Sequence, residues 1–230
     1  MKRYQIAGLL VDMEVSGRTA LQAEPYLAET EGPADITLQY DVKQLMALNP
    51  QLYSEEMVAY LGTGAIFARH LLDFEGSYLH ASAVVLEGKA FLFSAPSGTG
   101  KSTHTEKWCR LFGATYLNDD KPALRLLDGV WMAYGTPWSG KHDLSVPIGV
   151  PLGGIAFLKR GQINEIRRLT PAQALPIFMS QSLWRLPHPE AMDKQLQLAD
   201  RLLSQIPVWE LTCRNEDAAA ELSRAAMTGR

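Results

Sequence analysis

Nine residues in the middle of the chain, 95–103, constrain its fold more than any other stretch. They read Ala-Pro-Ser-Gly-Thr-Gly-Lys-Ser-Thr and match the phosphate-binding loop pattern G-x-x-x-x-G-K-[ST], except that Ala95 replaces the first glycine. The apolar run 90–93 predicts a buried strand before the loop, and residues 101–112 predict a helix after it that Gly113 can end. Backbone N–H groups and the helix dipole converge at such a junction and favour an anion. The stretch therefore predicts nucleotide binding.

The residues of this loop have expected roles around a bound nucleotide. The Lys101 ammonium is expected to reach the β- and γ-phosphates, and the Ser102 hydroxyl to sit on Mg²⁺. ATP and Mg²⁺ are therefore the predicted cofactors. A chance turn rich in glycine and serine is the alternative, but the strand and helix that the motif needs flank it here. The predicted nucleotide-binding residues are Ser97, Gly98, Thr99, Gly100, Lys101, Ser102 and Thr103.

Length, charge and cysteine content narrow the class of protein. A chain of 230 residues forms one large domain, or a domain with a small appendage, and can bury a core. The net charge of −3 argues against a nucleic-acid or membrane-surface partner. Two cysteines provide neither a disulfide framework nor a zinc spacing, and we find no leader pattern and no run of about 18 apolar residues. We expect a cytoplasmic protein, and the sequence leaves open whether identical chains associate.

The coarse organisation is mixed α/β in two predicted parts. Residues 1–50 predict a small β-rich lead-in, with strands at 4–11 and 36–40. Residues 51–230 predict the nucleotide-binding core, which begins with a helix from a Ser54 cap to about Leu72. The C-terminal part predicts a helix that opens at Thr170-Pro171, a helix over 190–204, a strand over 208–213, and a last helix over 216–227 that Asn215 caps.

The segment before the loop predicts a hairpin and therefore a mixed sheet. Apolar runs at 79–86 and 89–94 flank Glu87-Gly88, which is a two-residue turn signal. Following the pairing back from that turn puts His80 opposite Ala95, at the loop entrance. A histidine there suits phosphate contact or proton handling. A hydrogen-bonded framework histidine is the alternative, and both interpretations stay open.

Two adjacent carboxylates are expected beside the loop. The strand predicted at 114–117 runs parallel to the strand before the loop if the crossover is right-handed, and it ends at Asp119-Asp120. One carboxylate suits Mg²⁺, and the other suits a base that takes a proton from an incoming hydroxyl. Because neighbours in an extended chain point opposite ways, we expect the pair to divide these roles. A solvated turn is the alternative.

Two later segments offer candidates for the acceptor side of the site. In the loop at 135–143, Lys141 suits a transferred phosphate and Trp138 could flank a base or an acceptor, with a packed tryptophan in an ordered surface loop as the alternative. Arg160 follows an apolar strand. It suits the γ-phosphate as an arginine finger, or it is a charged hairpin end.

His80, the loop at 97–102 and Asp119-Asp120, in this order and spacing, resemble the HPr kinase/phosphorylase family, whose core is similar to that of phosphoenolpyruvate carboxykinases. The resemblance covers about residues 76–160. It implies an α/β fold with a mixed-sheet kinase core of this type, and ATP-dependent phosphorylation of a hydroxyl, often a serine of a protein or peptide. It also implies that His80 lines the phosphate site, that Asp119 is the base, and that Asp120 lies on the metal side with Ser102.

We therefore expect an enzyme, an ATP-dependent phosphotransferase that acts on a hydroxyl of a peptide, protein or small molecule. The catalytic set would be Asp119, His80 and Lys101. A carboxykinase-like enzyme is disfavoured because the chain lacks the length and the extra metal ligands of such enzymes. A non-catalytic nucleotide-binding protein is disfavoured because Lys101, Ser102 and both aspartates are all present.

Overall fold

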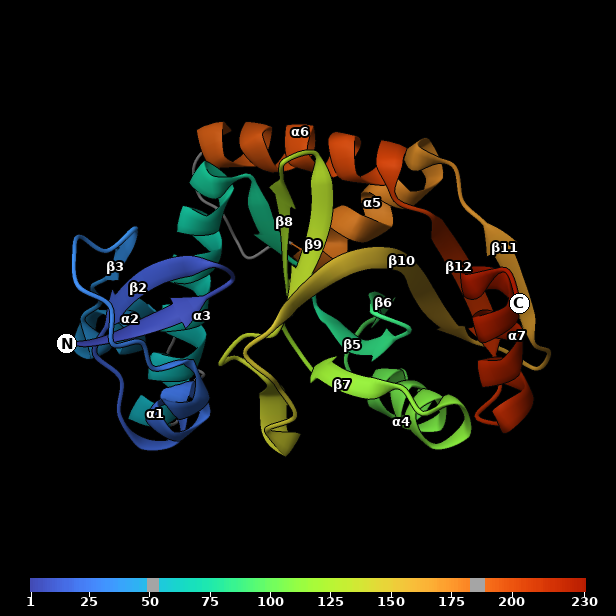
Figure 1. The fold of residues 1–230 in the computed structure, drawn as a ribbon, viewed down its shortest axis with the longest axis horizontal. Coiled ribbons are helices and arrows are strands. Elements are labelled where there is room, and N and C mark those ends of the chain that lie inside the picture. The colour runs from blue at the N-terminus through green and yellow to red at the C-terminus, as the bar shows by residue number, and fades with distance from the viewer. Residues whose placement is uncertain (49–53, 183–188) are drawn as a thin grey trace.

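The structure is a computed structural model, and it describes residues 1–48, 54–182 and 189–230. Within these ranges it contains a three-stranded sheet, a nine-stranded sheet and seven α-helices (Figure 1). The strands are β1 (Lys2–Ile6), β2 (Leu9–Met13), β3 (Ile36–Leu38), β4 (Gly76–Tyr78), β5 (Ala81–Leu86), β6 (Lys89–Ser94), β7 (Thr115–Asn118), β8 (Ala123–Leu127), β9 (Val130–Tyr134), β10 (Gly149–Arg160), β11 (Glu165–Arg168) and β12 (Val208–Cys213). The helices are α1 (Gly17–Ala23), α2 (Val42–Leu48), α3 (Glu55–Leu71), α4 (Lys101–Phe112), α5 (Pro171–Ser182), α6 (Pro189–Gln205) and α7 (Asp217–Thr228).

The large sheet is mixed, as the sequence predicts. Its order is β4-β8-β9-β10-β6-β5-β7, and β12 and β11 continue from β10. The β5–β6 hairpin has the predicted register, with Leu86 opposite Lys89 and Ala81 opposite Ser94. β7 pairs antiparallel with β5 and so runs in the direction of β6, and β10 pairs parallel with β6 on its other side. β6 is therefore an inner strand, and β7 and β10 end at the same edge of the sheet as β6. That this core is of the HPr kinase and carboxykinase type stays a prediction.

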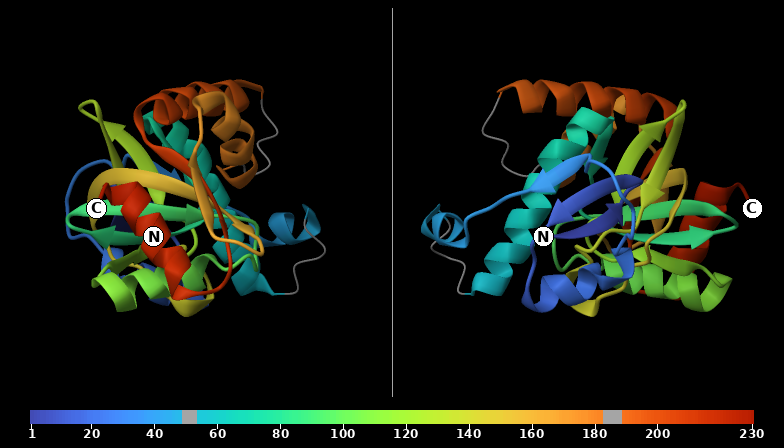
Figure 2. Two further views of the ribbon diagram at one scale, coloured as in Figure 1. Left: turned by 90° about the vertical axis from the view of Figure 1, so that its right-hand side faces the viewer. Right: turned by 60° about the vertical axis from the view of Figure 1, so that its left-hand side comes forward.

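Alternating side chains along β6 contribute to two hydrophobic layers. Phe91 and Phe93 pack around Trp108 of α4, in a cluster that also includes residues of α7. Leu92 and Ala90 belong to the opposite cluster, which includes residues of α5 and α6. In Figure 1, α5 and α6 lie above the sheet and α4 lies below it, and Figure 2 shows the same layers from two other sides. The strand that leads into the glycine-rich loop is thus fixed on both faces.

The N-terminal sheet corrects the prediction of a single strand over 4–11. The chain reverses at Ala7-Gly8, whose φ angles are +53° and +76°, and forms the hairpin β1–β2. Because the residues on both sides of this turn, from Ile6 to Val11, are apolar, the sequence pattern predicts one continuous strand. Alanine is also an unusual residue at positive φ. β3 then pairs parallel with β2, and it is shorter than the predicted 36–40.

Helix α3 packs against the small sheet at one side of the core. The Ser54 hydroxyl accepts a hydrogen bond from the Met57 N–H at 3.1 Å, so the predicted cap is confirmed. Phe67 of α3 stacks on Trp138 with ring centroids 5.1 Å apart, and Trp138 is fully buried. Trp138 is therefore the packed tryptophan of the two alternatives. The predicted boundary between residues 50 and 51 lies outside the described residues, and the division into two parts stays a prediction.

The C-terminal elements follow the prediction except at one cap. Thr170 and Gln173 form a capping box at the start of α5, in which the Gln173 Oε1 accepts from the Thr170 N–H at 3.0 Å. The prediction that Asn215 caps the last helix is wrong, because Glu216 occupies the N-cap of α7. The Asn215 Oδ1 instead accepts a hydrogen bond from the Lys107 Nζ at 2.5 Å. Of the helices described, none has both the length and the apolarity to cross a lipid bilayer.

Candidate functional site

The glycine loop, residues 95–100, joins the end of β6 to the start of α4. Gly98 and Gly100 have φ angles of +77° and +119°, and a Cβ on either would meet no atom within 4 Å. Glycine is therefore required here by backbone conformation rather than by lack of space. The first turn of α4 closes with a bond of 3.0 Å from the His104 N–H to the Gly100 carbonyl. The amides of residues 101–103 come before that bond, and the N-terminal amides of a helix can bind an anion.

Lys101 lies folded over this loop. Its side chain is largely buried, and its Nζ donates a hydrogen bond of 3.0 Å to the Ala95 carbonyl. Burial lowers the pKa of the ammonium group, and the charges of Asp120 and Asp119 act in the opposite direction. The Lys101 charge therefore lies between the loop and the two carboxylates.

A cavity of about 500 Å³ opens between the glycine loop and the two aspartates, and we call it the aspartate cavity. It contains ten of the twelve residues that the sequence predicts for catalysis or for binding nucleotide, metal or phosphate, all but Thr99 and Arg160. Segments far apart in the chain meet here, because β6, β7 and the start of β5 share one edge of the sheet. The lining residues are His80, Ser97, Gly98, Gly100, Lys101, Ser102, Thr103, Asp119, Asp120, Gly140, Lys141 and His142.

Asp119 is buried and belongs to a network of hydroxyl groups. Its Oδ1 accepts a hydrogen bond of 2.6 Å from the Ser82 hydroxyl of β5. Ser82 also lies 2.7 Å from the Thr105 hydroxyl, which bonds to the Ser102 carbonyl in the first turn of α4. No partner bonds to the Asp119 Oδ2 within the described ranges of the chain. Asp119 is thus oriented through one oxygen and retains the other for a ligand.

Asp120 has different neighbours, as the alternation of adjacent side chains predicts. Its Oδ2 accepts from the Lys121 Nζ at 2.5 Å and from the Tyr60 hydroxyl at 3.2 Å. Its Oδ1 lies 3.4 Å from the His80 Nε2. Burial and the Asp120 charge raise the pKa of Tyr60 well above its usual value, so Tyr60 remains a protonated donor at neutral pH. Asp120 is therefore a carboxylate surrounded by donors.

His80 lies at the loop entrance, where the hairpin register predicts it. The His80 Nδ1 is 3.3 Å from the Gln181 Oε1 of α5, and the backbone N–H of His80 donates to the backbone carbonyl of Gln181 at 2.9 Å. Burial and the Lys101 charge lower the pKa of the imidazole, against the effect of Asp120. The side chain both lines the aspartate cavity and bonds to the framework, so the two roles considered for His80 are not exclusive.

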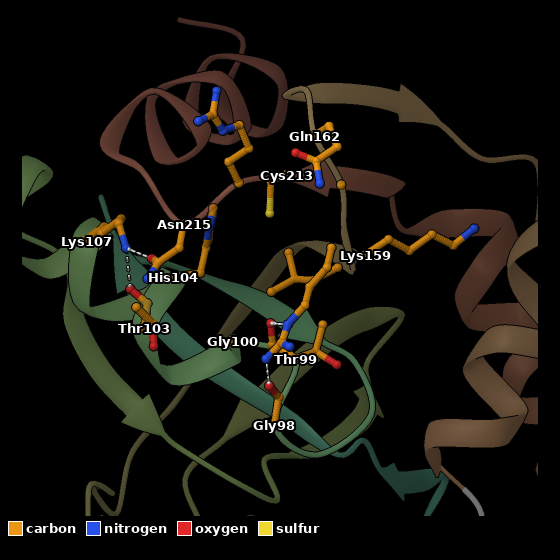
Figure 3. A pocket seen from close by; sticks show the side chains of 14 residues that line it. Gly98, Thr99, Gly100, Thr103, His104, Lys107, Lys159, Gln162, Cys213 and Asn215 are labelled. Atoms are coloured by element: carbon orange, nitrogen blue, oxygen red, sulfur yellow. Dashed lines mark hydrogen bonds between the residues drawn. The ribbon is translucent and has the colours of Figure 1, made fainter.

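A second cavity of about 510 Å³ lies on the other side of the glycine loop, and we call it the basic cavity (Figure 3). It is formed by α4, the end of β10 and the end of β12, and none of the described residues that line it carries a carboxylate. Arg160 and Thr99 are found here rather than in the aspartate cavity. The lining residues are Gly98, Thr99, Gly100, Thr103, His104, Lys107, Leu158, Lys159, Arg160, Gly161, Gln162, Cys213, Arg214 and Asn215.

A third cavity of about 320 Å³ adjoins the aspartate cavity and shares Gly140 and Lys141 with it; we call it the Tyr60 cavity. The Tyr60 hydroxyl separates the two, because it donates to Asp120 and accepts from the Gly140 N–H at 2.9 Å. The exposed Lys141 reaches both spaces. The remaining lining residues are Arg18, Glu56, Met57 and Leu61.

Sequence reasoning missed the residues that orient the aspartates. Asn118 had a local signal, since its Oδ1 accepts from the N–H groups of Asp120 and Lys121, at 2.9 and 2.7 Å, as turn-forming asparagines do. Ser82 could have been placed beside the α4 layer from the alternation of β5. Tyr60 had no signal, because its contact with Asp120 depends on how α3 packs on the core.

The aspartate cavity offers oxygen ligands of the type that Mg²⁺ prefers. The Asp120 carboxylate and the Ser102 hydroxyl both line it, and Mg²⁺ in phosphate-transfer sites is commonly held by one or two carboxylates together with substrate phosphates. Among the described residues, no cluster of three or more histidine, cysteine, aspartate or glutamate side chains could hold a metal ion alone. The residues present fit a magnesium ion that arrives with a nucleotide.

Comparison with known proteins identifies no family. No protein-family model matches the chain, and no curated protein matches it significantly. Among solved structures, the HPr(Ser) kinase/phosphatase from Coxiella burnetii is similar, with a TM-score of 0.39 and 12% sequence identity. The match covers 66% of this chain and 99% of that chain. This is a structural likeness, and the roles of the residues rest on the geometry above.

Proposed function

We propose that the protein is an ATP-dependent phosphotransferase, which transfers the γ-phosphoryl group of Mg·ATP to a hydroxyl of a peptide, protein or small molecule. One observation carries the proposal: the glycine loop, Lys101 and both aspartates line a single cavity. Phosphoryl transfer needs anion-binding amides, a cation at the phosphates, a metal site and a group that takes one proton. The aspartate cavity brings candidates for all four together.

The aspartate cavity and the basic cavity together suggest how a nucleotide would lie. The phosphates would bind to the amides at the start of α4 and to Lys101, in the aspartate cavity. The basic cavity continues from the same loop through Gly98, Gly100 and Thr103, and it has the size and position for the ribose and base. This direction puts the γ-phosphate beside Asp119 and Asp120.

The carboxylates would then divide the work. Ser102 and Asp120 would hold Mg²⁺, which when bound neutralises phosphate charge. Asp119 would accept the proton of the acceptor hydroxyl while that oxygen bonds to the γ-phosphorus, and the bond from the γ-phosphorus to the β–γ bridging oxygen breaks to release ADP. Lys101 and Lys141, which both line the cavity, would supply positive charge to the phosphates.

Titration of the wild-type protein with Mg·ATP by calorimetry tests the proposal. We expect binding, and we expect Lys101→Met to abolish it or to abolish turnover without a large fall in melting temperature. Lys89→Met is the matched control, because Lys89 is an exposed residue at the start of β6, far from the cavity. A wild-type protein that gives neither heat nor a thermal shift with Mg·ATP would refute the proposal.

A further inference from the structure

Arg160 reaches from the end of β10 to the backbone of the glycine loop. Its Nε donates to the Thr99 carbonyl at 3.3 Å, and its Nη2 donates to the Gly98 carbonyl. The contact follows from the sheet, because β10 pairs parallel with β6 and both strands end at the same edge. Figure 3 labels Gly98 and Thr99 in the lower part of the view and draws the bonds to their carbonyls as dashed lines.

These two bonds determine which way the peptide groups of the loop face. In a planar trans peptide the C=O and N–H bonds point in opposite directions. With the Thr99 carbonyl held on Arg160, the N–H of Gly100 points away from the basic cavity. The N–H of Thr99 donates to the Pro96 carbonyl at 3.3 Å, which closes a turn within the loop.

The loop needs such a restraint because of its composition. Gly98 and Gly100 adopt positive φ angles and carry no side chain that packs against the protein. Glycine populates several backbone regions at similar energy, so an untethered loop would lose much of its order. A peptide group that turned over would also present a carbonyl oxygen, rather than an N–H, to a bound phosphate.

We propose that Arg160 is a positioning residue that holds the Gly98 and Thr99 carbonyls on the basic-cavity side, so that the N–H of Gly100 faces the aspartate cavity. This role differs from that of an arginine finger, which contacts the transferred group. It agrees with the place of Arg160, which lines the basic cavity and not the aspartate cavity. A guanidinium suits the task because its planar fork presents two donors in fixed geometry. The role rests on the proposed function, since it concerns the binding of phosphates.

Titration calorimetry tests this role with two probes. One is Mg·ATP, and the other is inorganic triphosphate with magnesium. Arg160→Gln should weaken both by the same factor, on the order of tenfold, because hydrogen bonds to a charged group are lost while the phosphates keep their other contacts. The affinities of Arg160→Lys for both probes should lie between those of the wild type and those of Arg160→Gln. Arg167→Gln is the matched control, because Arg167 pairs with Glu210 on the neighbouring strand and lines neither cavity.

A second measurement needs no ligand. Backbone order parameters of Gly98, Thr99 and Gly100 from NMR relaxation should fall in Arg160→Gln and stay unchanged in Arg167→Gln. A loss of ATP affinity with triphosphate binding unchanged would show a direct nucleoside contact and overturn the role. A fall in kcat at unchanged ATP affinity would show an arginine finger and also overturn it, as would unchanged order parameters. A wild-type protein that binds neither probe would instead refute the proposed function itself.

Discussion

At the scale of single residues, the two aspartates differ in what already surrounds them. Asp120 has donors on both oxygens, whereas Asp119 has a single hydroxyl partner among the described residues. A base needs an oxygen that is free to take a proton. This difference is the basis on which we propose Asp119 as the base and Asp120 as the metal ligand.

Substitution of each aspartate by asparagine tests this division. Asp119→Asn should keep Mg·ATP affinity and lower phosphotransfer by about 10²–10⁴-fold, the range that a general base supplies. Asp120→Asn should instead weaken the magnesium dependence of ATP binding. Calorimetry at several magnesium concentrations, together with a phosphotransfer assay, measures both. If neither variant changes either quantity, the two aspartates serve only the packing of this turn, and the proposed division of roles is wrong.

Replacement of His80 separates its two contacts. Because its ring lines the aspartate cavity and lies 3.4 Å from Asp120, His80→Ala should reduce turnover far more than melting temperature. His80→Gln, which keeps a hydrogen-bonding group, serves as the partner variant for stability. Equal losses of turnover and stability in His80→Ala would identify a framework histidine.

At the scale of elements, the glycine loop depends on the conformation of Gly100 at the N-cap of α4. Gly100→Ala should lower the free energy of unfolding by about 1–2 kcal/mol, because alanine is strained at positive φ. Gly88→Ala is the control, since Gly88 also has positive φ and open space but lies in the β5–β6 turn. Urea unfolding should show similar losses, while calorimetry should show weaker Mg·ATP binding only for Gly100→Ala. Equal ATP affinities in the two variants would contradict the role of the loop.

The elements also show which parts of the fold can be predicted from the sequence. The β5–β6 register was predictable because a two-residue turn sets every pair that follows it. The direction of β7 was predictable because a helical crossover joins it to β6, and strands joined in this way usually run parallel. The β1–β2 hairpin was not, because Ala7 is an unusual residue at positive φ and Gly8 alone, within an apolar run, is only a weak turn signal. The cluster of Tyr60, Lys121 and His80 around Asp120 was also beyond prediction, since it joins α3, the turn after β7 and the start of β5 through tertiary packing.

At the scale of the whole molecule, α4 is fixed to α7 through a buried polar contact. The His104 Nε2 lies 2.9 Å from the Ser223 hydroxyl, which also accepts from the Trp108 indole N–H at 2.9 Å and donates to the Ala220 carbonyl. Because the Ser223 hydroxyl donates its hydrogen to the Ala220 carbonyl, its oxygen accepts from the imidazole of His104, which therefore carries its proton at Nε2. Burial lowers the pKa of His104 to about 3.

This histidine should make the protein less stable in acid. Because its pKa is about 3 when folded and about 6.5 when unfolded, its contribution is complete above pH 6.5 and is lost as the pH falls toward 3. The slope reaches about 1.4 kcal/mol per pH unit. Urea unfolding of the wild type and His104→Gln between pH 7.5 and 4 measures it. A stability difference between the two proteins that stays constant over this range would contradict the burial of a neutral imidazole.

The packing of the small N-terminal sheet has a consequence for the order in which the chain assembles. Its apolar face is covered by residues as distant as Tyr78, Ala123 and Trp138, and the Ala7 carbonyl accepts a hydrogen bond from Arg125 at 2.7 Å. During synthesis the first forty residues leave the ribosome long before these partners exist. This segment is therefore completed late, and until about residue 138 has emerged its hydrophobic face lacks part of the surface that covers it.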